Sequence, residues 1–149
     1  MITYREMIAL DIPVLVGMER EIYPESPWSA AQFREELSGV PNTRKYIVAT
    51  EANVIVGYAG IALAGNVADI HTLTVIPSHR KQGIATSMLH QLEEWGQSKD
   101  VEAFMLEMRE GNTEAQPLYE KRGYSVVSRR DNYYAPGIHA LIMRKEVAR

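Results

Sequence analysis

Stretches of alternating or β-branched apolar residues recur along the chain and predict seven strands. Such stretches are typical of strands because successive side chains point to opposite faces of a sheet. The turn-like segments Glu51–Asn53 and Gly65–Asn66 separate the second, third and fourth strands, which we expect to form an antiparallel meander. The predicted strands are Ile2–Met7, Tyr46–Thr50, Val54–Leu63, Val67–Val75, Ala103–Met108, Tyr124–Val127 and Ile138–Arg144.

Four segments carry the capping residues or the apolar periodicity of helices. Ser29 and Gln32 have the spacing of a capping box, in which each side chain satisfies the backbone N–H of the other residue. Asp11 is a second candidate N-cap. The predicted helices run from Asp11 to Ile22, from Ser29 to about Gly39, from Ile84 to Lys99 and from Thr113 to Arg122.

The order of these elements predicts an α+β fold. It reads β-α-α-β-β-β-α-β-α-β-β, so a run of hairpin-connected strands is followed by βαβ units. We therefore expect a mixed, mostly antiparallel sheet with helices on both faces. No repeat, low-complexity stretch or long linker interrupts the order, so residues 1–149 are expected to form a single domain.

Composition narrows the chemistry. The chain has a formal net charge of -3 and no cysteine, which excludes a cysteine nucleophile, a thiolate zinc site and disulfides. The negative charge disfavours bulk binding of nucleic acid. The N-terminus lacks the apolar core of a secretory signal, and the longest charge-free apolar run, Val54–Gly65, is too short for a spanning helix. We expect a soluble, cytoplasmic protein without a membrane partner.

Several well-known catalytic motifs are absent from the sequence. It has no GxGxxG, GxSxG or HExxH motif. Gly60 and Gly65 have the outer spacing of a P-loop, but Asn66 and Val67 follow where lysine and a hydroxyl residue are required. The four histidines are scattered along the chain, so we expect no metal site.

The segment between the fourth predicted strand and the third predicted helix is suited to hold an anion. It spans Leu73–Thr86, and Pro77 turns the chain toward the helix. Successive backbone N–H groups at a helix N-terminus attract anions, and Gly83 would let a phosphate approach the main chain. Arg80 and Lys81 add positive charge. An ordinary strand-to-helix turn with solvated basic residues explains the same pattern equally well.

A family resemblance favours the anion site. The run Arg80–Ala85 resembles the Q/R-x-x-G-x-G/A pyrophosphate signature of the GNAT acetyltransferase superfamily, with alanine replacing the commoner glycine at its last position. In that superfamily the signature also follows a strand and opens a helix, and the GNAT fold has the element order predicted here. The resemblance implies that the chain binds acetyl-CoA. The implied contacts are Leu73, Thr74 and Val75 for the pantetheine arm, and Lys81, Gln82, Gly83, Ile84, Ala85 and Thr86 for the pyrophosphate.

A narrower resemblance covers residues 106–124. This stretch is similar to the L-E-V-R-x-x-N-x-x-A-x-x-L-Y-x-x-x-G-F pattern of RimI-type enzymes, which acetylate the N-terminal alanine of a small-subunit ribosomal protein. The resemblance implies that Glu107 is the general base, Tyr119 the general acid and Asn112 a cofactor contact. These residue types suit the reaction, because an amine that attacks a thioester must lose a proton and the departing thiolate must gain one.

Two other interpretations of these residues remain open. Glu107 shares a strand face with Arg109, so an ion pair between the two is an alternative to a catalytic role. Tyr119 lies beside Leu118 on a short predicted helix, so it is alternatively a core tyrosine with a hydrogen-bonded hydroxyl.

Two further stretches are similar to the acceptor side of RimI-type enzymes. Pro27–Ser29 resembles part of their F-P-W-S element, and Arg130–Tyr134 resembles their R-x-N-Y-Y run. The resemblance implies a groove for an extended peptide, walled by Trp28, Tyr133 and Tyr134. Packing within a hairpin explains the two tyrosines equally well.

Together the resemblances imply a function. The chain is expected to transfer the acetyl group of acetyl-CoA to a protein N-terminal α-amine, by direct attack in a ternary complex. The expected acceptor is the N-terminal alanine of a small-subunit ribosomal protein. One alternative acceptor class is lysine side chains, polyamines or other small amines. A second alternative is a non-catalytic module that senses acetyl-CoA.

Overall fold

The computed structural model describes residues 1–148, and its seven strands join in one sheet. The strands are β1 (Ile2–Glu6), β2 (Arg44–Glu51), β3 (Val54–Ala64), β4 (Val67–Val75), β5 (Ala103–Arg109), β6 (Ser125–Ala135) and β7 (Ile138–Glu146). The helices are α1 (Ile12–Ile22), α2 (Ala30–Leu37), α3 (Ile84–Ser98) and α4 (Ala115–Lys121), with 3₁₀ turns at Ala9–Asp11 and Pro77–His79. This order confirms the predicted α+β fold.

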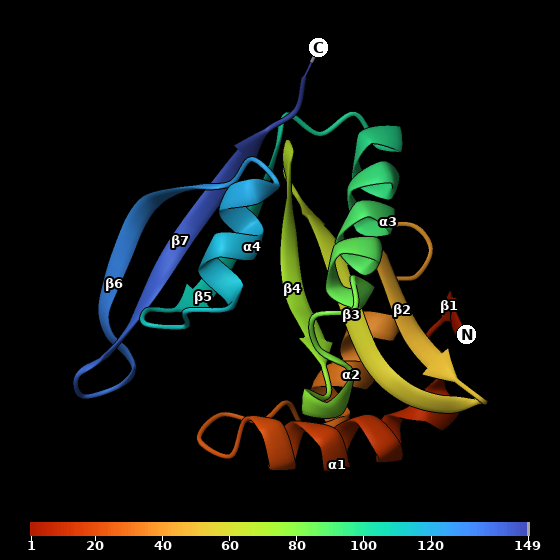
Figure 1. The fold of residues 1–149 in the computed structure, drawn as a ribbon. Helices are drawn as coiled ribbons and strands as arrows, with labels where there is room; N and C mark the ends of the chain where they lie inside the picture. The colour runs from red at the N-terminus through yellow and green to blue at the C-terminus, as the bar shows by residue number, and fades with distance from the viewer. Residues whose placement is uncertain (149) are drawn as a thin grey trace.

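The sheet is mixed, as predicted, with the strand order β1-β2-β3-β4-β5-β7-β6. All neighbouring strands are antiparallel except β4 and β5. These two pair only where Val67–Ile70 faces Ala103–Leu106, although β4 continues to Val75 and β5 to Arg109. The strands therefore separate beyond this short ladder, and Figure 1 shows β6 and β7 leaning away from β4. The separation frees backbone groups on the facing edges for other partners.

Helices cover both faces of the sheet, with α3 and α4 on one side and α1 and α2 on the other (Figure 1). The alternation of side chains along β2 builds a core on each face. Ala49 packs with Met88 of α3 in one core. Val48 packs with Leu15 of α1 and Phe33 of α2 in the other. Within residues 1–148, no helix combines the length and the apolar character that crossing a bilayer requires.

The predicted capping box at the start of α2 is confirmed. The backbone N–H of Gln32 donates to Ser29 Oγ at 3.2 Å, and the N–H of Ser29 donates to Gln32 Oε1 at 2.8 Å. Asp11 occupies the predicted N-cap position of α1, but its side chain makes no capping bond to the helix. Its carboxylate instead accepts from the Ile8 N–H at 2.8 Å and from the Arg5 guanidinium at 2.9 Å. Asp11 therefore secures the 3₁₀ turn before the helix.

Strand β6 is longer than the sequence predicts. The predicted strand stops at Val127, whereas β6 continues to Ala135. Residues 125–133 are all exposed on this edge strand, so no apolar alternation marks its continuation. The ends of the other strands and helices agree with their predicted ends within two residues.

Candidate active site

A cleft of about 1490 Å³ opens where β4 and β5 separate. The cleft is lined by residues of the α1–α2 connection (residues 23–29), β4, the start of α3, β5, α4 and β6. The predicted site residues in its lining are Trp28, Leu73, Thr74, Val75, Lys81, Gly83, Ile84, Ala85, Thr86, Glu107, Asn112, Tyr119 and Tyr134. Gln82 and Tyr133 are not among the lining residues. The fold thus collects most of the predicted residues around one cavity.

The start of α3 leaves main-chain donors without a side-chain partner. Lys81 and Gly83 adopt left-handed backbone conformations, with φ of 63° and 81°. Gly83 occupies the N-cap position, and no side chain among the described residues caps the helix there. The first-turn N–H groups of residues 84–86 therefore lack the acceptor that an N-cap side chain usually supplies. Together with the helix dipole, these groups fit a phosphate group.

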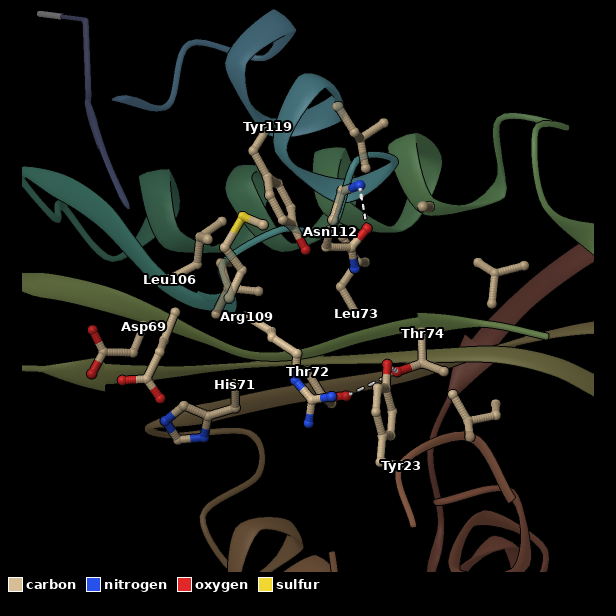
Figure 2. Close-up of a pocket in the computed structure, with 18 of the residues that line it drawn as sticks. Tyr23, Asp69, His71, Thr72, Leu73, Thr74, Leu106, Arg109, Asn112 and Tyr119 are labelled. Carbon is tan, nitrogen blue, oxygen red and sulfur yellow. Dashed lines mark hydrogen bonds between the residues drawn. The ribbon is translucent and has the colours of Figure 1, made fainter. Parts of the chain in front are cut away.

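Strand β4 presents a free edge and an ordered side chain to the cleft. Beyond Ile70 its edge on the β5 side is not paired with that strand. Residues 73–75 lie along this edge, so their main-chain groups are placed to pair with an extended ligand. The side chain of Thr74 meets that of Tyr23 (Figure 2), and Thr74 Oγ1 lies 2.8 Å from the Tyr23 hydroxyl oxygen.

Glu107 lies on the face of β5 that looks toward the α1–α2 side of the cleft. Its side chain is 31% exposed, and its Oε1 lies 3.4 Å from Arg130 Nη1 of β6. The alternative ion pair with Arg109 is not formed, because Arg109 Nη2 lies 2.5 Å from Glu25 Oε2 in the α1–α2 connection. Glu107 is therefore a carboxylate that a ligand in the cleft can reach.

Tyr119 projects from α4 into the cleft (Figure 2). The residue is 8% exposed, and its ring packs edge-on against Tyr124 at 5.9 Å between centroids. Burial raises the pKa of Tyr119 above its ordinary value, so the hydroxyl keeps its proton at neutral pH. Within residues 1–148 no group is hydrogen-bonded to that hydroxyl. The ring belongs to the core, as one interpretation expected, but the hydroxyl remains available to a ligand.

Asn112 lies in the cleft lining but uses its side-chain oxygen for local structure. Its Oδ1 accepts from the backbone N–H of Glu114 at 3.1 Å and of Ala115 at 2.9 Å. These bonds satisfy donors at the start of α4, the helix that carries Tyr119. The remaining polar group of the side chain, the amide nitrogen, is the one left for a cofactor.

Trp28 lies at the end of the α1–α2 connection and lines the cleft. Its ring packs against Phe33 at 5.2 Å and lies 6.3 Å from the ring of His71, measured between centroids. Its backbone N–H donates to Glu19 Oε1 at 2.8 Å. Ring packing and a main-chain hydrogen bond thus both fix the position of Trp28.

The two tyrosines of β6 lie differently. Tyr134 lines the cleft, and the guanidinium of Arg109 lies over its ring at 5.2 Å. Burial and the nearby Glu107 carboxylate raise the pKa of Tyr134 to about 12. Tyr133 is 50% exposed and packs against the edge of Tyr134 and beneath the Arg130 guanidinium. Its predicted contact with an acceptor stays a prediction.

Glu19 and Tyr23 line the cleft, but the sequence analysis did not find them. Glu19 is only 2% exposed despite its charge. A signal for it existed, because Glu19 follows Ile12 and Leu15 at helical spacing on the apolar stripe of α1. Tyr23 follows the last residue of α1, and nothing in the local pattern distinguishes it from an ordinary core tyrosine.

Among residues 1–148, no three histidine or acidic side chains gather as metal ligands do.

Comparisons with known proteins agree with this architecture. Residues 13–124 match the acetyltransferase (GNAT) family. The chain is 35% identical to an uncharacterised protein of Mycobacterium leprae over 91% of its own length, but it spans only 38% of that protein. It is 32% identical to the N-alpha-acetyltransferase RimI of Mycobacterium tuberculosis, over 82% of this chain and 77% of the relative.

A solved structure shares the fold. The ribosomal-protein-alanine N-acetyltransferase of Escherichia coli superposes with a TM-score of 0.86 at 24% identity, covering 100% of this chain and 96% of that one. The matched fold, the family match over residues 13–124 and the cleft between β4 and β5 all agree. The chain belongs to the GNAT acetyltransferase family.

Proposed function

We propose that this chain transfers the acetyl group of acetyl-CoA to the α-amine of a protein N-terminus. The proposed acceptor is the N-terminal alanine of a small-subunit ribosomal protein. One observation carries the proposal: the Glu107 carboxylate and the unbonded Tyr119 hydroxyl belong to the same cleft as the uncapped start of α3. Enzymes of the GNAT family use acetyl-CoA, so a donor site and two proton-transfer groups are the parts such a transfer needs.

The donor end of the cleft suits coenzyme A. The first-turn N–H groups of α3, with Arg80 and Lys81 beside them, would hold the diphosphate. The free edge of β4 at residues 73–75 would pair with the amides of the pantetheine arm as a neighbouring strand does. Arg80 Nε donates to the Val75 carbonyl oxygen at 3.1 Å. This bond holds residues 76–83, which lead into α3, against the end of that edge. The two parts of the donor site are thereby held together.

The reaction needs two proton transfers, which we assign to Glu107 and Tyr119. The acceptor nitrogen bonds to the acetyl carbon while the carbon–sulfur bond breaks, so one proton leaves nitrogen and one joins sulfur. Glu107 accepts the proton of the amine, directly or through one water molecule. An α-amine has a pKa of about 8, so this carboxylate needs no extreme tuning. Tyr119, which burial keeps protonated, donates to the thiolate and then regains a proton from solvent.

The acceptor side favours a chain end. Trp28 of the α1–α2 connection and Tyr134 of β6 both line the cleft, and Arg109 contacts both segments through Glu25 and the ring of Tyr134. An extended terminus can enter between two segments linked in this way more readily than an internal segment of a folded protein can. The similarity to an N-alpha-acetyltransferase supports the choice of an α-amine.

Peptide acetylation tests the proposal. The protein is incubated with acetyl-CoA and one of three acceptors, and products are measured by mass spectrometry. The acceptors are a peptide that begins with alanine, the same peptide with a blocked N-terminus and one internal lysine, and spermidine. We expect transfer to the free alanine alone. Transfer to the lysine or to spermidine would move the function to the alternative acceptors. Calorimetric binding of acetyl-CoA without any transfer would indicate a sensing module.

A further inference from the structure

A buried carboxylate lies beneath residues 23–28 of the α1–α2 connection, which we call the acceptor wall. This carboxylate takes no part in the proposed proton transfers. Glu19 of α1 is 2% exposed, and its two oxygens have separate partners. Oε1 accepts from the backbone N–H of Trp28 at 2.8 Å, and Oε2 accepts from the hydroxyl of Tyr58 on β3. A buried charge is costly unless it is fully hydrogen-bonded, and an apolar residue would fill this position on the helix stripe at lower cost.

The partners of Glu19 connect the acceptor wall to the sheet. Tyr58 is fully buried in the core beneath α1 and α2, so its hydroxyl is a fixed point. The Trp28 N–H lies at the far end of the α1–α2 connection, immediately before the capping box that starts α2. Glu19 thus joins α1, the sheet and the start of α2 through one side chain.

The near end of the same connection has its own anchor. The hydroxyl of Tyr23 is hydrogen-bonded to Thr74 Oγ1 on β4 at 2.8 Å. Residues 23–28 are therefore held at one end by β4 and at the other by Glu19. Between these anchors lies Glu25, whose ion pair with Arg109 reaches the opposite wall. The connection is a short, tethered segment whose position depends on both anchors.

We propose that Glu19 is a positioning residue that sets the acceptor wall, and that this role serves acceptor recognition rather than donor binding. The inference rests on the proposed acetyl transfer for its kinetic meaning. Glu19 touches neither the start of α3 nor the free edge of β4 through its hydrogen bonds. Losing it should release Trp28 and Glu25 from their places while the donor site keeps its geometry.

Two variants of Glu19 and one matched control test this role. Glu19→Leu removes both acceptor oxygens and suits the apolar stripe, whereas Glu19→Gln keeps one carbonyl oxygen at the same reach. Glu93→Gln is the control, because Glu93 is also buried, at 4% exposure, and accepts from Tyr124 and Lys145 between α3 and β7. All four proteins are assayed with the alanine peptide and acetyl-CoA.

The KM for each substrate gives the first readout. Glu19→Leu should raise the KM for the acceptor peptide by about tenfold and Glu19→Gln by about threefold, the effect of losing hydrogen bonds to a charged group. The KM for acetyl-CoA should stay within about twofold in every variant, and Glu93→Gln should change neither constant. An unchanged acceptor KM, or an equal rise in both constants, would overturn the proposal. If Glu19→Leu does not fold, the threefold effect of Glu19→Gln decides it.

Amide exchange gives a second readout that does not require catalysis. The N–H of Trp28 should exchange with solvent about tenfold faster in Glu19→Leu than in the wild type, while the amides of α3 keep their rates. Unchanged exchange at Trp28 would overturn the role of Glu19 even if acetylation is observed. Conversely, a wild-type protein that acetylates no amine would refute the proposed function and leave the exchange result standing.

Discussion

The proposed donor and acceptor sides of the cleft are built in different ways. The proposed donor side consists mainly of main-chain groups from one continuous stretch, residues 73–86, which runs from β4 into α3; the side chains of Arg80, Lys81 and Asn112 add to it. The acceptor side consists of side chains that arrive from the α1–α2 connection, β5, α4 and β6. Glu25 and Arg109, for example, meet across a sequence separation of 84 residues. A main-chain site is encoded by a short motif, whereas a side-chain site depends on how the sheet assembles distant segments.

The two sides also differ in their electrostatics. No carboxylate among the described residues forms an ion pair with Arg80 or Lys81, so the donor side keeps the positive character that a diphosphate needs. On the acceptor side, Glu25 pairs with Arg109 and Glu107 with Arg130. Ion pairs this exposed contribute about 0–1 kcal/mol, so a bound amine can replace Arg130 beside Glu107 at little cost.

Glu107→Gln should have the largest effect and should be confined to the acceptor side. Turnover should fall by about 10³-fold, within the range that general base catalysis contributes. The KM for acetyl-CoA should hardly change, because Glu107 is not one of the proposed donor contacts. The loss should be greatest at acidic pH, where fewer acceptor amines are already neutral. Steady-state kinetics between pH 6 and 9 measure both effects.

Glu110→Gln is the matched control for Glu107→Gln. Glu110 follows the same strand, but its carboxylate lies 2.9 Å from Arg129 Nε, and the residue is not among those that line the cleft. Its replacement should leave turnover near the wild-type value. A pH–rate profile of Glu107→Gln with the same shape as that of the wild type would contradict a role as general base.

Tyr119→Phe should have the next largest effect. Turnover should fall by about 10²-fold, the lower end of what general acid catalysis contributes, with little change in acetyl-CoA affinity by calorimetry. Tyr124→Phe is the control, since Tyr124 is also buried but its hydroxyl donates to Glu93 at 2.8 Å. That variant should lose thermal stability and keep its turnover. Equal losses of turnover and affinity in Tyr119→Phe would indicate a packing role instead.

The same contrast explains what the sequence could and could not predict. The strand and helix on either side of residues 76–83 follow from local periodicity, whereas the positive φ of Gly83, which favours glycine, is shown only by the structure. The partner of Glu107 was not predictable from strand alternation, which suggested Arg109. The actual partner, Arg130, lies on the exposed part of β6 that carries no apolar pattern. Its approach to Glu107 depends on how β6 and β7 pair beside β5.

Side chains with two separate partners were also beyond the sequence analysis. Glu19 interrupts an apolar stripe, which marks it as unusual, but its partner Tyr58 lies 39 residues away on β3. Asn112 matched a family pattern, yet only the structure shows that its oxygen is bonded to the start of α4. In both cases the residue type was visible and the partner was not, because tertiary packing chooses the partner.

Gly83→Ala should have the smallest of these effects, and it probes the donor side alone. Alanine at a φ of 81° is strained by roughly 1 kcal/mol, and its methyl group would project into space that is free of protein atoms, where we place the diphosphate. The KM for acetyl-CoA should rise by about fivefold, whereas the acceptor KM should not change.

Gly65→Ala imposes the same strain at a φ of 66° in the turn between β3 and β4, also beside open space. This control should lose similar stability in thermal unfolding and keep both KM values, because strain alone does not disturb the start of α3. If the two variants raise the KM for acetyl-CoA equally, the main-chain account of donor binding is wrong.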